Sequence, residues 1–246
     1  MSPENIALVF LAFAAGGVIK GATGAGAPLF AVPLMVMLRD VQFAVAVFVL
    51  PNIVPNLWQF WTNRHAAVPA GFLWPFALAG GAGAGLGTLA LAGWKPDALM
   101  LTVALALTAY IVFRLVRPAW TMPPVTARRI VVPAGLVAGA LQGASGLSAP
   151  VSLSFLNAAG LERRAFVATV SLFFVALGVV QLPVQIAYGI MTGERFLYSL
   201  FSLLPLILFM PVGSWIGRRL SRALFDRLIL LILAALAIKL LLDVLG

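Results

Sequence analysis

The residues of this sequence that could do chemistry are one lysine and several hydroxyls and amides, which interrupt long apolar stretches. Lys20 precedes the glycine-rich octet GATGAGAP at 21–28, and a related octet, GASGLSAP, follows at 143–150. Glycine leaves backbone groups uncovered, and the proline that closes each octet suits the first turn of a helix. Because helix N-termini attract anions, two such turns predict a binding site for a small anion.

Lys20 would supply the formal positive charge of this site, with side-chain hydroxyls as further donors. A cation inside a bilayer costs about 2.5–3.5 kcal/mol on insertion scales, so it usually has a partner or a ligand. The alternative is that Lys20 extends its stem and reaches the membrane surface. Its position beside the turn favours the ligand-facing role.

The amides within the apolar stretches allow two interpretations. They could line the cavity of the anion site, or they could bond neighbouring helices and carbonyls freed by proline, a role worth about 1 kcal/mol. The structural role is favoured for Asn56 and Gln185. The predicted substrate-binding residues are Lys20, Thr23, Gly24, Gly26, Asn52, Gln59, Gln142, Ser145, Gly146, Ser148 and Gln181.

Other chemistries lack the residues that they need. The sequence has no cysteine, and its single histidine, His65, lies beside Arg64 in a predicted turn. A metal site or a catalytic triad would need further partners. The seven acidic residues fall in predicted turns or near the chain ends, so no carboxylate proton relay is visible. We therefore expect no catalytic activity, no metal and no cofactor.

The composition is that of a membrane protein. Hydrophobic residues make up 63% of the chain and charged residues 9%, whereas about a quarter of a soluble domain is charged. The uncharged windows exceed the roughly 20 residues of a membrane-spanning helix, and they are apolar on all sides, unlike β-barrel strands. The net charge of +9 lies in short turns, which argues against nucleic acid as a partner. No basic residue precedes the first apolar run, so we expect the N-terminus to be retained.

The two octets belong to a longer internal repeat. At the same offset of 122 residues, Lys20 falls on Gln142, Asp40 on Glu162 and Gln59 on Gln181. After an eight-residue insertion, Pro75 falls on Pro205, Gly83 on Gly213 and Gly87 on Gly217. This ordered series predicts a duplicated unit. We expect a first repeat at 1–116, a cytoplasmic linker at 117–129 and a second repeat at 130–246.

The predicted fold is all-α, and each repeat combines a re-entrant glycine-rich hairpin with three transmembrane helices. Several hairpin segments are shorter than a bilayer crossing, which favours segments that enter and leave on one side. The hairpin segments are 5–20 and 28–38, then 130–142 and 150–158. The transmembrane helices are 41–63, 68–93 and 97–116, then 164–189, 196–220 and 225–245.

A hairpin followed by three crossings gives an odd number of crossings, so the second repeat should be inverted. With the central linker inside, this topology places eleven Lys and Arg residues in cytoplasmic turns and four outside, as the positive-inside rule requires. Both termini are then periplasmic, in a bacterial inner membrane. Inverted repeats with interrupted helices indicate a transporter with a site near the bilayer midplane.

The sequence resembles the TauE/SafE family of sulfite and organosulfonate exporters. The resemblance rests on the glycine-rich segments 21–33 and 143–150, the acidic turns at Asp40 and Glu162, and the glycine pairs Gly83/Gly87 and Gly213/Gly217. It covers residues 5–245. It implies transport of a small sulfur-containing oxyanion, such as sulfite, isethionate, sulfoacetate or a taurine product. The sequence departs from the family's dense glycine runs at Ala27-Pro28 and at Ser148-Ala149-Pro150.

We therefore expect a membrane transporter that binds its anion between the two hairpin tips and works by alternating access. The alternatives are an anion channel or facilitator and a membrane scaffold subunit without transport activity. The expected partners are a small anionic substrate and the lipid bilayer, with a homodimer left open and nucleic acid excluded. Sequence alone does not separate import from export.

Overall fold

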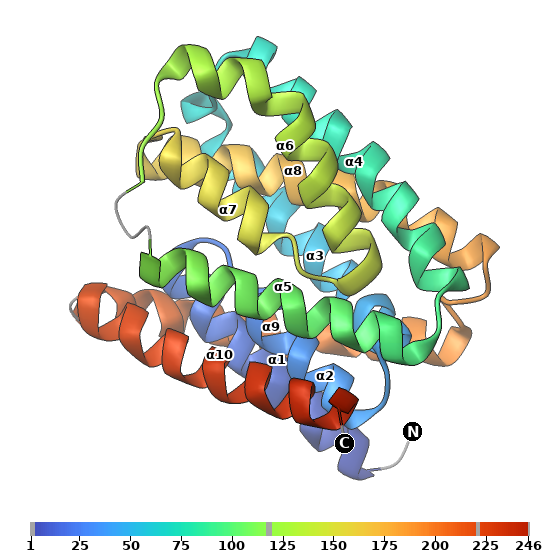
Figure 1. Cartoon of the computed structure of the whole chain (residues 1–246). Helices are drawn as coiled ribbons and strands as arrows, with labels where there is room; N and C mark the ends of the chain where they lie inside the picture. Colours follow the sequence, from blue (N-terminus) through green and yellow to red (C-terminus); the bar gives the residue numbers. More distant parts are fainter. Residues whose placement is uncertain (1–2, 117–119, 220–221, 246) are drawn as a thin grey trace.

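The computed structural model describes residues 3–116, 120–219 and 222–245, which form ten α-helices and one short 3-10 helix (Figure 1). In chain order they are α1 (Pro3–Thr23), α2 (Ala27–Leu38), α3 (Val41–Asn63), η1 (Arg64–Ala66), α4 (Ala70–Gly93), α5 (Pro96–Val116), α6 (Pro124–Ser145), α7 (Ala149–Ala158), α8 (Arg163–Ala187), α9 (Gly193–Arg219) and α10 (Arg222–Leu245). The all-helical prediction is confirmed, and the six predicted long helices appear within a few residues of their expected bounds.

The first arm of each hairpin is longer than predicted. Helix α1 has 21 residues and α6 has 22, so each is about 30 Å long, enough to cross the hydrocarbon core. Helix α6 begins at Pro124, inside the predicted linker, because proline suits the first turn of a helix. Seven described helices are long and apolar enough to cross a membrane, and α1 and α6 are among them. Helices α2 and α7, with 12 and 10 residues, are too short.

Local sequence explains where the hairpins turn. Gly24, Gly26 and Gly146 have φ values of 84°, 93° and 75°, a left-handed conformation that favours glycine. These residues end α1 and α6 and let the chain reverse into α2 and α7. Asp40 then begins α3, because its carboxylate accepts the backbone N–H of Phe43 at 2.6 Å.

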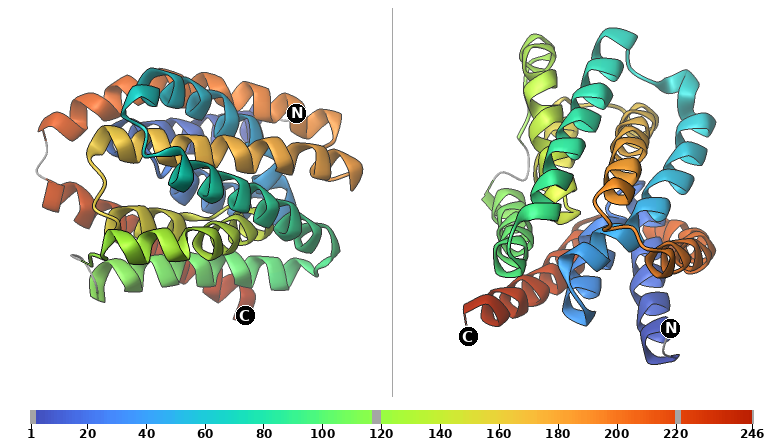
Figure 2. Two further views of the ribbon diagram at one scale, coloured as in Figure 1. Left: turned by 90° about the horizontal axis from the view of Figure 1, so that it is seen from above. Right: turned by 90° about the vertical axis from the view of Figure 1, so that its right-hand side faces the viewer.

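Helices of the first half pack mainly against helices of the second half. Helix α1 packs against α9, and its counterpart α6 packs against α4. Helix α3 contacts α8 at the centre, α2 contacts α10, and α7 contacts α5 (Figure 2). These contacts therefore recur with the halves interchanged, as a duplicated unit would produce.

Glycines make the α1–α9 and α4–α6 contacts close. A side chain at Gly21 would collide with the backbone of Met210, and one at Gly139 with the backbone of Gly80. Small residues allow such backbone approach between helices in membranes. The packing role expected for the glycines of α4 and α9 is therefore confirmed.

The same contacts correct the predicted sequence alignment of α4 with α9. A side chain at Gly87 would meet the carbonyl of Ala140, and one at Gly213 would meet the carbonyl of Val18. Ala140 and Val18 are 122 residues apart, so Gly213 takes the place of Gly87, four residues from the predicted pairing. Glycines recur at four-residue spacing in α4 and α9, so an alignment of the two helices that is shifted by four residues still pairs glycine with glycine.

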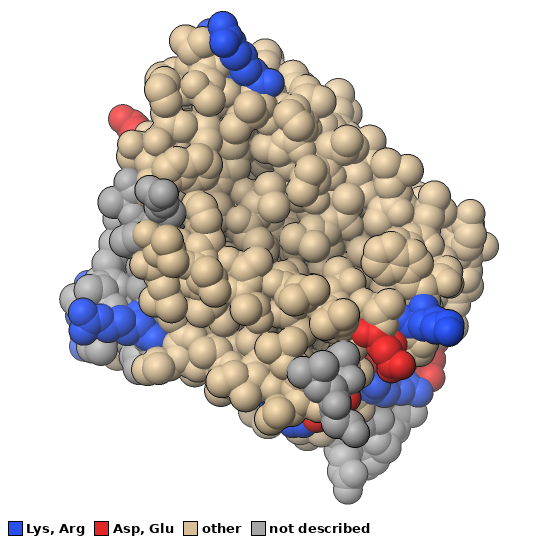
Figure 3. Space-filling model, viewed as in Figure 1, with Lys and Arg blue, Asp and Glu red and all other residues tan. Residues whose placement is uncertain are grey.

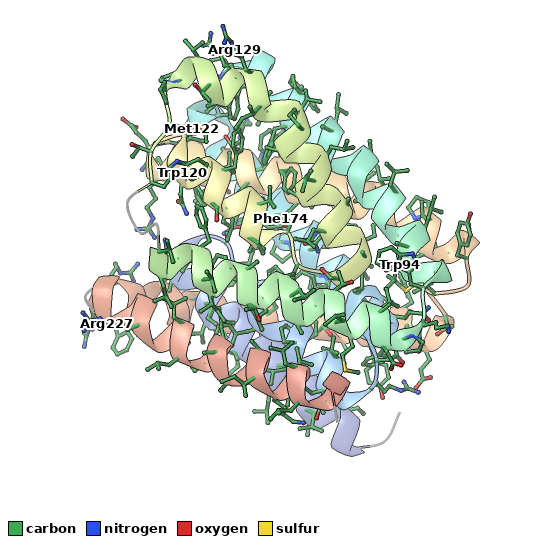
Figure 4. The ribbon with its side chains drawn as sticks, in the orientation of Figure 1. Trp94, Trp120, Met122, Arg129, Phe174 and Arg227 are labelled. Carbon is green, nitrogen blue, oxygen red and sulfur yellow. The ribbon has the colours of Figure 1, made fainter. Side chains whose placement is uncertain are left out.

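The distribution of charged and aromatic side chains is that of a bilayer-embedded protein. The face formed by α5, α6 and α7 shows no charged side chain across its middle among the described residues, and Lys and Arg gather at its edges (Figure 3). Arg129 and Arg227 lie toward one end of the helices and Trp94 toward the other (Figure 4). All six tryptophans are exposed on the surface of the protein, as expected for residues at membrane interfaces.

Candidate functional site

Lys20 is the one lysine buried inside the protein among the described residues. It lies in the last turn of α1, is 2% exposed, and its Nζ donates a hydrogen bond to Oδ1 of Asn56 at 2.7 Å. The side chain therefore does not extend to the membrane surface. The structural role favoured for Asn56 was a bond between helices or to a backbone carbonyl, and Asn56 makes both kinds of bond, one of them to the buried Lys20.

The hydrogen bonds continue from Asn56 across the centre of the protein. Asn56 Nδ2 donates to the backbone oxygen of Asn52 at 2.6 Å, and Asn52 Nδ2 donates to the backbone oxygen of Phe174 at 3.0 Å. Phe174, labelled near the middle of Figure 4, stands 122 residues after Asn52 and so occupies the same position in its repeat. This Lys20 network, formed by Lys20, Asn56, Asn52 and Phe174, joins α1, α3 and α8.

The charge of Lys20 is not balanced by a carboxylate of the described residues. The ion pairs that the structure shows lie elsewhere, at Arg39–Glu194, Arg195–Asp40 and Lys239–Asp243. An ammonium has three donor hydrogens, and Asn56 supplies one acceptor. A buried cation whose partner is one neutral amide is suited to bind an anion.

The hydroxyl of Thr23 makes its hydrogen bonds within the first hairpin turn, between α1 and α2. The Thr23 hydroxyl donates to the backbone oxygen of Ile19 at 2.8 Å, lies close to the oxygen of Ala25, and accepts the N–H of Ala25 at 3.2 Å. Thr23 is exposed, whereas Gly24 and Gly26 are buried. The hydroxyl of Thr23 is thus engaged within the turn.

The second hairpin turn is closed by a buried amide. Gln142, the repeat counterpart of Lys20, accepts the backbone N–H of Ser148 at 3.1 Å through Oε1. The Ser145 hydroxyl donates to Leu141 at 2.7 Å and accepts the N–H of Leu147 at 3.3 Å. Lys20 therefore bonds outward to α3, whereas Gln142 bonds within its own turn.

Ser148 is better placed than Ser145 to offer a donor. Its hydroxyl is buried and accepts a hydrogen bond from Ser152 at 3.2 Å. A hydroxyl that accepts a bond still has its own hydrogen to give. Ser148 can therefore donate to a ligand while it remains tied to α7.

Each turn lies against the third helix of the other repeat. A side chain at Gly24 would meet Val167 of α8, and one at Gly146 would meet Val45 of α3. Val45 and Val167 are again 122 residues apart. Convergence of the two turns on one shared anion remains a prediction.

The two equivalent glutamines are not paired with each other. Gln59 is half-buried on α3 and Gln181 is buried on α8. Oε1 of Gln59 and Nε2 of Gln181 are both buried without a hydrogen-bond partner. Of the predicted amides, Asn52 thus belongs to the Lys20 network, and the two glutamines remain free to accept or donate.

Several buried polar residues were not predicted to belong to the binding site. Ser199 of α9 accepts the backbone N–H of Leu50 at 3.1 Å, and Tyr198 beside it is fully buried with an unpaired hydroxyl. Gln185 of α8 is also fully buried, and both of its amide atoms are unpaired. The signal in the sequence was a polar side chain within a long apolar helix, which the repeat comparison did not select.

The protein has a cavity of about 300 Å³ that is separate from these residues. It lies where the α4 and α6 helices begin, and Arg128 is its only charged lining residue. None of the predicted site residues lines it. The candidate site is therefore the Lys20 network and its polar surroundings.

Comparison with protein-family models matches residues 8–240 to the family described as sulfite exporter TauE/SafE. The chain belongs to this family. The match includes every residue of the Lys20 network and both hairpin turns of this TauE/SafE member. No curated protein matches the chain, and no solved structure does.

Membership in the TauE/SafE family implies a multi-pass membrane protein that exports sulfite or a related sulfur anion. It agrees with the seven apolar helices and with the anion preference reached from Lys20 and the glycine-rich turns. A family of transporters is also consistent with the expectation that the chain is not an enzyme.

Proposed function

We propose that the protein exports a small sulfur-containing oxyanion from a bacterial cell, and that Lys20 binds this anion within the inner membrane. The substrate class is sulfite or an organosulfonate such as isethionate, sulfoacetate or a taurine product. The single observation that carries the proposal is the buried ammonium of Lys20, which the neutral amide of Asn56 holds and no described carboxylate balances. An oxyanion would supply both the missing charge and the missing acceptors.

The rest of the site would come from the hairpin turns and the central helices. Backbone N–H groups where α2 and α7 begin, directly after Gly26 and Ser148, and the hydroxyl of Ser148 would complete the donors around a small oxyanion. The turns at Gly24 and Gly146 would position these donors. Gln59, with Oε1 unpaired, and Gln181, with Nε2 unpaired, would line the approach. Thr23, Gln142 and Ser145 would support the site by closing its turns.

Alternating access would follow from the packing of the two halves against each other. If the repeats are inverted, the hairpin tips enter the membrane from opposite sides and both termini are periplasmic. Rocking of one half against the other would then open Lys20 to one side at a time. The crossing of α3 and α8, where Asn52 donates to the backbone oxygen of Phe174, would be the pivot of this motion.

The experiment is flux of labelled sulfite, isethionate, sulfoacetate, taurine and sulfate across liposomes that contain the purified protein. We expect saturable flux of one sulfur anion, with loss of at least about 90% in Lys20→Ala. The matched control is Lys239→Ala, which removes an exposed lysine that pairs with Asp243. Flux that does not saturate would indicate a channel, and no flux of any anion by the folded protein would overturn the proposal.

A further inference from the structure

One face of α8 carries a row of buried polar side chains without partners. Ser171, Gln181 and Gln185 are each buried, and the structure gives no partner for Ser171 Oγ, Gln181 Nε2 or either amide atom of Gln185. At 100° per residue these three positions lie within about 80° of one another around the helix. Their first and last members are about 21 Å apart along the axis, most of the thickness of the hydrocarbon core.

The same face of α8 meets the Lys20 network. Phe174 and Gly178 lie between Ser171 and Gln181 on this face. The carbonyl of Phe174 accepts the amide of Asn52, and a side chain at Gly178 would meet Ile53 and Asn52 of α3. The row therefore runs past the residues that hold Lys20.

The row ends beside an ion pair. Gln185 lies in the last turns of α8, and its carbonyl accepts the N–H groups of Ile190 and Met191 in the turn that follows. Nη1 of Arg195 donates to the carbonyl of Ile190 at 2.8 Å, and Nη2 of Arg195 lies 3.9 Å from the carboxylate of Asp40. The unpaired amides thus lie between the buried ammonium of Lys20 and the Arg195–Asp40 ion pair at the α8–α9 turn.

A row of unpaired polar atoms on one face is costly in an apolar helix. Each polar group that is left unsatisfied in a membrane costs several kcal/mol, so a row on the face that meets the Lys20 network indicates water, a ligand or a polar cavity along that face. From the position of these amides on the face that meets the Lys20 network, we propose that Gln181 and Gln185 form a second set of donors, along which the anion moves between Lys20 and the α8–α9 turn. This inference rests on the proposed function, because it assigns the route of the same anion.

The absence of cysteine makes a direct test simple, because single cysteines can be introduced without background. The probe is a methanethiosulfonate that carries a sulfonate group, applied to Gln181→Cys and Gln185→Cys in liposomes. The matched control is Thr169→Cys. Thr169 is equally buried and unpaired on α8, but lies about 120–160° away from the two glutamines.

We expect Gln181→Cys and Gln185→Cys to react at least about tenfold faster than Thr169→Cys, and sulfite to slow their reaction. Equal rates at all three positions, or no reaction at either glutamine position, would overturn the inference. A second measurement uses Gln185→Leu, which should lower sulfite flux at least about tenfold while equilibrium binding of sulfite changes less than threefold. Unchanged flux in this variant would also overturn it.

The two proposals fail in distinguishable ways. If the wild-type protein carries no sulfur anion, the proposed function fails whatever the labelling pattern. If flux and its dependence on Lys20 are found but labelling does not distinguish Gln185 from Thr169, only the α8 route fails.

Discussion

Asn52 donates its side-chain N–H to the backbone oxygen of Phe174 at 3.0 Å, and the two residues are 122 positions apart, the offset of the predicted repeat. If the two halves are a duplicated unit, equivalent residues meet where the halves cross. The contact lies at the crossing of α3 and α8. Lys20 is tied to this crossing through Asn56, which bonds to the backbone of Asn52 one turn earlier.

Replacing Asn52 tests how much this contact contributes. Asn52→Leu removes the hydrogen bond to Phe174 and leaves the helix backbone of α3 intact. We expect a loss of about 1 kcal/mol in stability, the usual magnitude for a hydrogen bond between membrane helices. We also expect a loss of flux greater than this loss of stability explains. The measurements are thermal unfolding in detergent and flux in liposomes, with Asn63→Leu at the end of α3 as the control.

The sequence predicted the helices and the turns well, because those depend on local signals. Apolar length defined the long helices, and the octets at 21–28 and 143–150 contain the glycines at which both hairpins turn. It underestimated α1 and α6, since glycine within a membrane helix can mark close packing and not an end. Gly16, Gly17 and Gly21 continue α1 for this reason.

The site was less predictable, because tertiary partners do not follow from repeat equivalence. Gln59 and Gln181 are equivalent, but their unpaired atoms show that they do not bond to each other. Asn56 has a glycine, Gly178, as its counterpart, and yet it holds Lys20 across 36 positions of sequence. Lys20 has a neutral counterpart, Gln142, in the other half of the sequence. The residue that binds Lys20, Asn56, therefore needs no counterpart of its own.

Placing a carboxylate beside Lys20 tests the role of its charge. In Asn56→Asp an anionic oxygen would lie near Nζ, where the amide oxygen is now at 2.7 Å. The new carboxylate should pair with the ammonium and compete with the substrate, so we expect sulfite binding to weaken at least about tenfold. Titration calorimetry measures this, and Asn63→Asp is the matched control. Binding that is as tight in Asn56→Asp as in the wild type would contradict a charge role for Lys20.

The close contact between α4 and α6 predicts a large effect of a small substitution. A side chain at Gly87 would collide with the backbone of Ala140, whereas one at Gly71 would meet nothing within 4 Å. We expect Gly87→Val to lose about 1–3 kcal/mol of stability or more, because backbone atoms must move. Gly71→Val on the same helix should change it little. Thermal unfolding of both variants provides the comparison, and equal midpoints would mean that the helices are not this close.

Alanine substitutions at the glycines of the hairpin turns distinguish the cost of backbone strain from the cost of steric overlap. Gly26 has φ 93° with room for a methyl group, so Gly26→Ala should cost about 1–2 kcal/mol from strain alone. At Gly146 the methyl group would also press on Val32 and Val45, which predicts a larger loss for Gly146→Ala. Gly160→Ala, with φ 67° in open space between α7 and α8, reports strain away from the site. Unfolding should rank Gly146→Ala as the least stable. Flux should fall in Gly26→Ala and Gly146→Ala but remain near wild type in Gly160→Ala. Only the hairpin turns at Gly26 and Gly146 direct backbone donors toward the proposed anion. Equal loss of flux in all three would mean that strain, and not the geometry of the turns, limits transport.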